Sequence, residues 1–311
     1  MFSHSNILSV RHFYGKTSMR LSVVIPTYNG GTKLAEQLEA LAHQIDAGPF
    51  EVIISDNGSS DDTLDVVRHY TGKVPDLRIV DSSDRSGRSH ARNAGAEAAI
   101  TEALAFTDQD DVVCETWVRA MGTALEKYDF VTGPIDRKKL NEPWQAEYSE
   151  YQIREPHIHK YPPYLAHAPA NNLGIKRSLH RSIGGFDESL TFAWEDVDYA
   201  FRLQLAGTKL HFAHDALVHY RLRHDFGSIY RQARAYGKGN VAFYKKYEPM
   251  AHVNEPWKAR INAWISLLRP RTLLSLWNKS RRAWWTSRLG WQIGHIQGCI
   301  TYCILAPLFW M

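Results

Sequence analysis

The stretch Leu21-Ser-Val-Val-Ile-Pro-Thr-Tyr-Asn-Gly-Gly31 predicts the fold class of this chain. Its first five residues are almost all apolar, as in a strand whose two faces are both buried in a parallel sheet. We expect Pro26 to end this strand, because proline has no N–H to donate to a sheet ladder. A helix should then follow the loop, capped by Thr32 and carrying one apolar face made of Leu34, Leu38 and Leu41.

The same alternation of strand and helix continues downstream. A helix is expected to end near Tyr70, and another should run over Ser89–Ile100. Strands are predicted around these helices at Glu51–Ser55, Leu77–Val80 and Ala103–Thr107. Strands that alternate with helices are typical of an α/β protein with a parallel sheet.

Polar residues stand where three of these strands end. They are Thr27-Tyr28, Asp56-Asn57 and Asp108-Gln-Asp-Asp111. Ligands of parallel sheets bind at the carboxyl ends of the strands, so these residues are candidates for a polar ligand site. No G-x-G-x-x-G or P-loop follows the first strand, which argues against a dinucleotide oxidoreductase or a P-loop kinase. Phosphate groups bound here would need a metal ion.

Asp108 and Asp110 are the candidate metal ligands. Two carboxylates spaced by one residue at a strand end suit Mg²⁺ or Mn²⁺ bridging phosphate oxygens. The alternative is a solvated acidic turn that caps a helix beginning near Cys114. His219, at the end of an apolar run, is the best candidate among the fifteen histidines for a further metal ligand, although a single histidine is as often structural.

Three residues near the strand ends have two interpretations each. Asp56 could accept a hydrogen bond from the imide N–H of uracil or thymine, or it could belong to a plain capping loop. Arg88 and Arg92 flank a helix start, where arginines assist diphosphate binding, but surface arginines are also common.

Acidic residues also open a later helix at Trp194-Glu-Asp-Val-Asp198. Acids stabilise a helix N-terminus, and this accounts for one or two of them. The preceding Gly184-Gly185 loop, however, would hold Glu195 and Asp196 at the rim of a cleft, where a carboxylate could act as a general base toward a hydroxyl group.

The charge of the chain is unevenly distributed. Residues 257–311 contain eight basic residues and no acidic one, which leaves 29 basic against 33 acidic residues in the remainder. Seven of the ten tryptophans also lie in this segment. Tryptophan beside lysine and arginine favours a membrane interface, and we expect surface association rather than nucleic-acid binding. A span over Leu289–Met311, a soluble helical subdomain and an oligomer contact are the alternatives.

Taken in order, the motifs resemble those of the family 2 glycosyltransferases, which have the GT-A fold. The resemblance covers about Leu21 to Tyr220, roughly two thirds of the chain. It implies a Rossmann-like, mostly parallel sheet flanked by helices. The matching segments are Val23-Val-Ile-Pro-Thr-Tyr-Asn29, Asp56-Asn-Gly-Ser-Ser-Asp-Asp-Thr63, Ala91-Arg-Asn-Ala-Gly95, Asp108-Gln-Asp-Asp111, Gly184-Gly-Phe-Asp-Glu188 and Glu195-Asp196.

The resemblance also implies roles for individual residues. Asp108 would contact ribose or the metal, Asp110 would ligate Mn²⁺ or Mg²⁺, and Asp196 would be the catalytic base. Trp194 and Glu195 would position the acceptor. The nucleotide-sugar donor would be bound by Pro26, Thr27, Tyr28, Asp56, Arg88 and Arg92. Asn57 departs from the family pattern, which often has a second aspartate there, and this leaves the base preference open.

The implied activity is inverting transfer of a sugar, from a UDP-sugar in the first instance, to a glycan or lipid-linked acceptor of the cell envelope. A sugar-nucleotide nucleotidyltransferase and a non-catalytic carbohydrate or lipid adaptor are the rivals. We expect an N-terminal extension at 1–20, a catalytic domain at 21–225 with halves at 21–111 and 112–225, and a membrane-associating helical region at 226–311. Within that region we expect a helix over 226–247 that breaks near Gly237-Lys-Gly239. The three cysteines favour a reducing location, on the cytoplasmic side of the membrane, and a homo-oligomer is possible.

Overall fold

A computed structural model describes residues 21–150, 159–160, 165–191, 193–247 and 257–304. Its central sheet has seven strands in the order β11-β6-β10-β4-β1-β2-β3. The strands β1, β2, β3 and β4 are parallel, whereas β10 is antiparallel to both β4 and β6. The bounds are β1 (Leu21–Thr27), β2 (Phe50–Asp56), β3 (Leu77–Asp81), β4 (Ala103–Phe106), β6 (Phe130–Thr132), β10 (Leu173–Lys176) and β11 (His211–Phe212). The predicted mostly parallel sheet is therefore confirmed.

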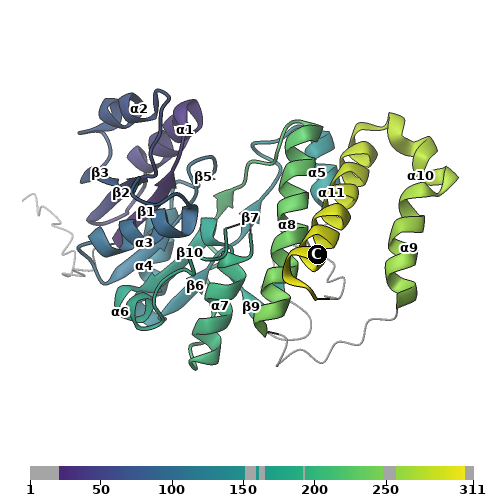
Figure 1. Cartoon of the computed structure of the whole chain (residues 1–311). Coiled ribbons are helices and arrows are strands. Elements are labelled where there is room, and N and C mark those ends of the chain that lie inside the picture. Colours follow the sequence, from purple (N-terminus) through teal and green to yellow (C-terminus); the bar gives the residue numbers. More distant parts are fainter. Residues whose placement is uncertain (1–20, 151–158, 161–164, 192, 248–256, 305–311) are drawn as a thin grey trace, which may run out of the picture.

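Helices cover both faces of this sheet, as Figure 1 shows. The pleat turns alternate residues of β1 to opposite sides, so Val23 and Ile25 contact one layer of helices and Val24 contacts the other. The first layer contains α1 (Gly31–Ala42), α2 (Thr63–Tyr70) and α4 (Trp117–Lys127), and the second contains α3 (Arg88–Ala98) and α7 (Glu195–Leu205). This arrangement leaves the carboxyl edge of the strands free for a site.

Two details at the end of β1 differ from the sequence expectations. Pro26 does not end the strand but lies within it, in register with Ser55 of β2. The pairing of β1 with β4 stops at Val24, so β1 runs beyond β4 on that side. Thr32 does not cap α1 either, because Thr63 takes this role. Its Oγ1 accepts hydrogen bonds from the N–H groups of Gly30 (2.8 Å) and Gly31 (3.1 Å).

Short elements connect the sheet to the later part of the chain. A small sheet orders its strands β5-β12-β7, where β12 (Val218–His219) pairs with β5 (Val112–Val113) and β7 (Ile135–Asp136). It brings the segment after β12 next to the acidic loop after β4. The remaining elements are α5 (Pro143–Glu150), β8 (His159–Lys160), β9 (Ala166–His167), η1 (Ala170–Asn172) and α6 (Arg177–Ser182).

The C-terminal part is helical, as expected. It contains α8 (Phe226–Tyr247), α9 (Trp257–Leu268), α10 (Pro270–Leu274), η3 (Ser275–Trp277) and α11 (Lys279–Tyr302). In Figure 1 these helices stand together at the end of the molecule opposite α2 and β3. Among the described residues, no helix is long and apolar enough to cross a bilayer. The part of Leu289–Met311 beyond residue 304 lies outside the described residues.

The predicted break in α8 at its glycines is wrong, because these glycines serve close helix packing instead. A Cβ on Gly237 would lie 2.0 Å from the carbonyl oxygen of Trp291 in α11. On α11, a Cβ on Gly290 would lie 2.6 Å from the carbonyl of Tyr230, and one on Gly294 only 1.9 Å from the carbonyl of Arg234. From Gly290 to Gly294 in α11, the nearest carbonyl of α8 moves from Tyr230 to Arg234. The two helices therefore run in the same direction with their backbones in contact. The missing side chains make that approach possible.

Candidate functional site

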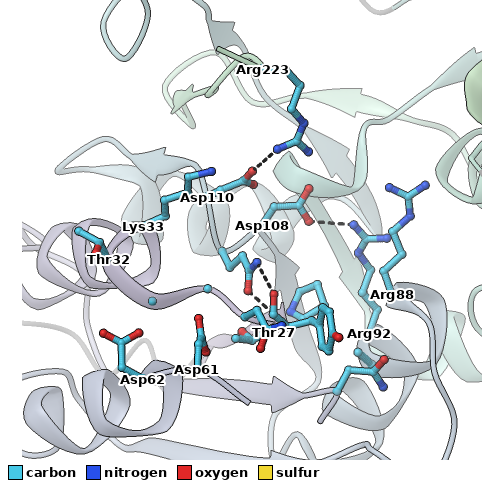
Figure 2. Close-up of a pocket in the computed structure, with 18 residues that line it drawn as sticks. Thr27, Thr32, Lys33, Asp61, Asp62, Arg88, Arg92, Asp108, Asp110 and Arg223 are labelled. Carbon is cyan, nitrogen blue, oxygen red and sulfur yellow. Dashed lines mark hydrogen bonds and ion pairs between the residues drawn. The ribbon is translucent and has the colours of Figure 1, made fainter. Parts of the chain in front are cut away.

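A cavity of about 640 Å³ opens at the carboxyl edge of the central sheet. It lies where the loops after β1 and β4 meet the N-terminus of α3 and the segment after β12 (Figure 2). Its lining therefore joins residues that are far apart in sequence. They include Pro26, Thr27, Tyr28, Lys33, Asp61, Asp62, Arg88, Arg92, Asp108, Gln109, Asp110 and Arg223.

Gln109 fixes the loop that follows β1. Its side-chain oxygen accepts a hydrogen bond from the N–H of Tyr28 (2.9 Å), and its side-chain nitrogen donates to the Tyr28 carbonyl (3.0 Å). Gly30 passes so close that an added Cβ would lie 2.7 Å from the Gln109 oxygen. The Tyr28 side chain is left 58% exposed beside the cavity, where an aromatic ring can stack on a flat ligand.

Asp56 lies at the end of β2 but does not line the cavity. It is buried, and its carboxylate accepts a hydrogen bond from the N–H of Ser59 (3.2 Å). The neighbouring Asn57 does line the cavity and accepts a hydrogen bond from the N–H of Gly87 (2.8 Å). In this structure Asp56 thus orders the loop, and its contact with a nucleotide base stays a prediction.

Two arginines of α3 tie the donor side of the cavity to the start of α7. Arg92 is almost fully buried, and its guanidinium contacts the carboxylates of Asp108 (2.8 Å) and Glu195 (3.1 Å). Arg88 is half exposed and pairs with the same Glu195 oxygen at 2.6 Å. A buried guanidinium requires such partners, since taking an unpaired charge out of water is costly. The sequence motifs contain Arg92, Asp108 and Glu195, and Arg88 is a candidate from its place at a helix start, but the sequence did not reveal this network.

The second aspartate of the motif has a different partner. Asp110 pairs with Arg223 at 3.0 Å, and its backbone carbonyl accepts a hydrogen bond from Arg221 (2.9 Å). Figure 2 shows Asp108 and Asp110 side by side, each with its own arginine. Arg223 comes from the segment between β12 and α8, and sequence reasoning missed it because only the fold brings it to Asp110.

Asp111, the last residue of this acidic loop, anchors the loop in the protein interior. Its side chain is fully buried and accepts hydrogen bonds from the Asn171 amide (2.6 Å) and the Arg221 N–H (2.9 Å). Burial, together with the nearby charges of Asp110 and Asp108, raises the pKa of Asp111 well above its usual value. The carboxyl group is therefore a fixed structural element next to Asp108 and Asp110.

The start of α7 holds the predicted base. Burial raises the pKa of Asp196, while the positive charges of Arg88 and Arg92 oppose this effect. Trp194, immediately before the helix, has a left-handed backbone (φ 76°), and its indole N–H donates to the carbonyl of Tyr236 in α8 at 2.9 Å. The indole is buried and packs on Phe243, so its predicted contact with an acceptor stays a prediction.

Tyr236 is a residue of the site that the sequence did not indicate. Burial raises the pKa of its hydroxyl, and the charges of Arg88 and Asp196 also act on it. The Tyr236 side chain therefore lies near Glu195 and Asp196, which means that α8, a helix of the C-terminal region, packs beside the start of α7. A tyrosine in a long helix carries no sequence signal for such a position.

His219 is not among the residues that line the cavity. Its Nδ1 contacts the Asp136 carboxylate at 2.8 Å, and its Nε2 lies 3.3 Å from the Lys139 amine. Metal ligation by His219 would have to replace one of these contacts. Within the described part of the chain, no three histidine, cysteine, aspartate or glutamate side chains form a cluster that could hold a metal ion.

Asp108 and Asp110 nevertheless form a donor set that fits Mg²⁺ or Mn²⁺. Both carboxylates line the cavity, and each presents hard oxygen atoms. Magnesium sites at phosphates commonly use only one or two protein carboxylates and take their other ligands from phosphate oxygens and water. A complete cage of protein ligands is thus not required at this position.

A mostly parallel α/β sheet, with a cavity of aspartates paired with arginines at its carboxyl edge, is the architecture expected of a glycosyltransferase. Sequence comparison agrees with this class: the family model for glycosyl transferase family 2 matches residues 22–184, and that for glycosyl transferase family group 2 matches residues 105–311. The chain belongs to the family 2 glycosyltransferases.

Relatives and solved structures extend the comparison. Glycosyltransferase AglE of Haloferax volcanii is 28% identical over 71% of this chain and 73% of its own length. Validoxylamine A glucosyltransferase of Streptomyces hygroscopicus subsp. jinggangensis is 30% identical over 60% of this chain and 52% of its own.

Solved structures that share the fold include one from S. aureus and one from Pyrobaculum calidifontis. TarS 1–349 of S. aureus, in complex with UDP-GlcNAc, has a TM-score of 0.55 at 17% identity and covers 90% of this chain and 92% of its own. The mannosyltransferase PcManGT of Pyrobaculum calidifontis, in complex with GDP-Man and Mn²⁺, has a TM-score of 0.62 at 20% identity. The match covers 90% of this chain and 86% of the mannosyltransferase chain.

Proposed function

We propose that this glycosyltransferase moves a sugar from a nucleoside-diphosphate sugar, UDP-sugars first, to an acceptor hydroxyl with inversion at the anomeric carbon. One observation carries the proposal. Asp108 and Asp110 line the same cavity as Arg88, Arg92 and Arg223, and Arg88 and Arg92 contact the helix that begins at Glu195. Donor phosphates in the cavity would thus lie next to the start of α7, where Asp196 would act as the base, although Asp196 is not among the residues that line the cavity.

The proposed reaction is a single displacement. The Asp196 carboxylate takes the proton of the acceptor hydroxyl while the hydroxyl oxygen forms a bond to the anomeric carbon. The bond from that carbon to the diphosphate oxygen breaks, and its electron pair leaves with the nucleoside diphosphate. A base is most effective when its pKa is not far below the working pH, and the raised pKa of Asp196 is consistent with this role.

Basic residues that line the cavity would neutralise the charge of the leaving group. Arg88, Arg223 and Lys33 supply positive charge from three different segments. Mn²⁺ or Mg²⁺ held by Asp108 and Asp110 would supply further charge to the phosphate oxygens. Glu195 holds both α3 arginines and so orients them, and through them Asp108, toward the donor.

The acceptor class is the second part of the proposal. We infer a glycan or lipid-linked acceptor of the cell envelope, because the helical region with its basic and tryptophan-rich sequence borders the α7 side of the site. Family membership favours glycosyl transfer over nucleotidyl transfer, and a non-catalytic adaptor would not need a carboxylate with a raised pKa beside Arg88 and Arg92.

Nucleotide-dependent thermal stabilisation tests the donor site. UDP, GDP, dTDP and CMP would each be added with and without Mn²⁺ to the wild type, to Asp110→Ala and to the control Glu126→Ala, an exposed acid on α4 outside the cavity. A nucleotide at 100 times its Kd should add about 2.7 kcal/mol of stability. We expect metal-dependent stabilisation by UDP that Asp110→Ala loses and Glu126→Ala keeps.

The stereochemistry of the product tests the mechanism. An α-linked donor should yield a β-glycoside, which NMR of the anomeric proton distinguishes from the α-product. Retention would contradict a single displacement with Asp196 as base. Stabilisation by none of the four nucleotides, in protein shown to be folded, would favour the adaptor.

A further inference from the structure

Exposed apolar side chains concentrate at the end of the molecule far from β3. Fourteen large hydrophobic residues of the described chain are exposed, and eight of them lie between Ile261 and Ile300. Trp277 has the largest exposed fraction of the fourteen, 83%, and Leu274 follows with 73%. Six of these residues succeed one another along α9, α10 and η3, and we call them the apolar patch: Ile261, Ile265, Leu268, Leu273, Leu274 and Trp277.

The apolar patch stands on a fixed support. The opposite side of α9 is buried at Ala263 and Leu267. The backbone carbonyls of the same two residues accept hydrogen bonds from α11: the Gln292 amide donates to Ala263 (3.1 Å), and the indole N–H of Trp285 donates to Leu267 (3.0 Å). Since α9 already buries one face in the protein, its outer face is available for another surface.

Basic residues surround the apolar patch. Arg269 and Arg271 lie between its α9 and α10 members, and Lys279, Arg281 and Arg282 follow Trp277; all five are exposed. No acidic residue occurs from 257 to 311. Of the five basic residues, Lys279 pairs with Glu142 at 3.3 Å. Exposed apolar side chains bordered by exposed basic residues complement a surface that offers both negative charge and a hydrocarbon layer.

We propose that the apolar patch docks on the surface of an anionic lipid bilayer, with Leu274 and Trp277 entering the interface and the arginines contacting the lipid headgroups. Within the described residues no helix can span, so docking parallel to the surface is the mode that fits. Trp277 suits this depth, because tryptophan concentrates at membrane interfaces. A second copy of the chain suits the patch less well, since symmetric pairing would bring the exposed Arg269 and Arg271 of both copies together.

Vesicle flotation of the full-length chain tests this proposal. One vesicle would contain phosphatidylcholine alone and the other equal parts of phosphatidylcholine and phosphatidylglycerol. The wild type should float with the anionic vesicle and much less with the neutral one. Leu274→Glu with Trp277→Glu should weaken anionic vesicle binding about tenfold or more, because two side chains no longer leave water.

Matched variants separate the patch from a general effect of added charge. Ile100→Glu with Leu205→Glu also replaces two exposed apolar residues by acids, but in the sheet part of the molecule (61% and 52% exposed). This double variant should float like the wild type. Arg269→Gln with Arg271→Gln should lower binding to anionic vesicles about tenfold and leave binding to neutral vesicles unchanged.

Three results would overturn the proposal. The first is a wild-type protein that floats with neither vesicle. The second is a patch variant that floats as well as the wild type. The third is a wild type that sediments as a dimer, becomes monomeric in the patch variant and does not float, which would assign the patch to a second copy of the chain. UDP-dependent stabilisation measured on each variant reports the donor site separately from lipid binding.

Discussion

The sheet region (residues 21–225) and the helical region (residues 226–304) are held together in opposite ways. In the sheet region, branched and aromatic side chains fill the two layers around the strands, and the polar site residues stand at the strand ends. In the helical region, α8 and α11 meet where side chains are missing, at Gly237, Gly290 and Gly294. In the sheet region a site residue can therefore be changed without disturbing the buried layers, whereas in the helical region a side chain added at these glycines would push α8 and α11 apart.

The largest expected effect is on catalysis alone. Asp196→Asn should lower kcat by about 10²–10⁴, the usual contribution of a positioned base. The free energy of unfolding should stay equal or rise, because burial already disfavours the charged form of this carboxyl. Turnover and urea unfolding of the same preparation measure both quantities, with the exposed Asp129→Asn as control. A kcat near that of the wild type would assign the base to another residue.

The helical region should show the reverse pattern. Gly294→Ala puts a Cβ 1.9 Å from the carbonyl oxygen of Arg234, so α8 and α11 must separate. We expect a loss of up to about 3 kcal/mol in unfolding free energy, the upper range for overpacked sites. Activity at low temperature should fall only with the folded fraction. A variant as stable as the wild type would show that the two backbones are not in contact.

Acidification should act on the sheet region through His180. This buried histidine contacts the Tyr199 hydroxyl at 2.7 Å, and burial lowers its pKa to about 4. The unfolded chain then binds a proton more readily than the folded one, so this contribution to stability is complete above about pH 6.5 and is lost as the pH falls toward 4. Between pH 7 and pH 5 it should amount to about 2 kcal/mol.

Urea unfolding at the two pH values measures this effect. His180→Gln should be less sensitive to the same change in pH by about the same 2 kcal/mol. An equal dependence in wild type and variant would mean that other groups account for the acid sensitivity.

The smallest effect should come from a glycine without a close neighbour. Gly122 lies inside α4, and a Cβ there would meet nothing within 4 Å. Gly122→Ala should raise the unfolding free energy by roughly 0.5–1 kcal/mol, because alanine favours the helix and glycine does not. It is the matched control for Gly294→Ala, since both substitutions add one methyl group inside a helix. A loss of stability here would remove the contrast between the two regions.

The sequence was sufficient for the first half of the sheet region. Strands β1 to β4 follow from short apolar runs, and the polar residues after them follow from where those runs stop. Arg223 was not predictable, because its place beside Asp110 depends on the small sheet that joins β12 to β5. Tyr236 likewise reaches the site only through the packing of α8 against Trp194.

The glycines of α8 show why the helical region was harder to predict. A glycine within a helical pattern indicates either a break or a close approach, and the sequence of one helix does not distinguish them. The distinction depends on the partner helix, α11, which follows only after α9, α10 and η3. A single histidine likewise gives no information about its neighbours. His219 contacts Asp136 and lies beside Lys139, and its role as a metal ligand stays a prediction.

The hydrogen bond from Trp194 to α8 has a consequence for the newly made protein. Trp194 immediately precedes the carboxylates of α7, and its indole N–H donates to the carbonyl of Tyr236 in α8. Helix α8 in turn packs against α11. A ribosome adds these partners only after it has made the complete sheet region. Because chains emerge from the N-terminus onward, strands β1 to β4 are available to fold early, and the start of α7 gains the support of α8 and α11 only once both helices have emerged. An enzyme assembled in this order would acquire its final catalytic geometry near the end of its own synthesis.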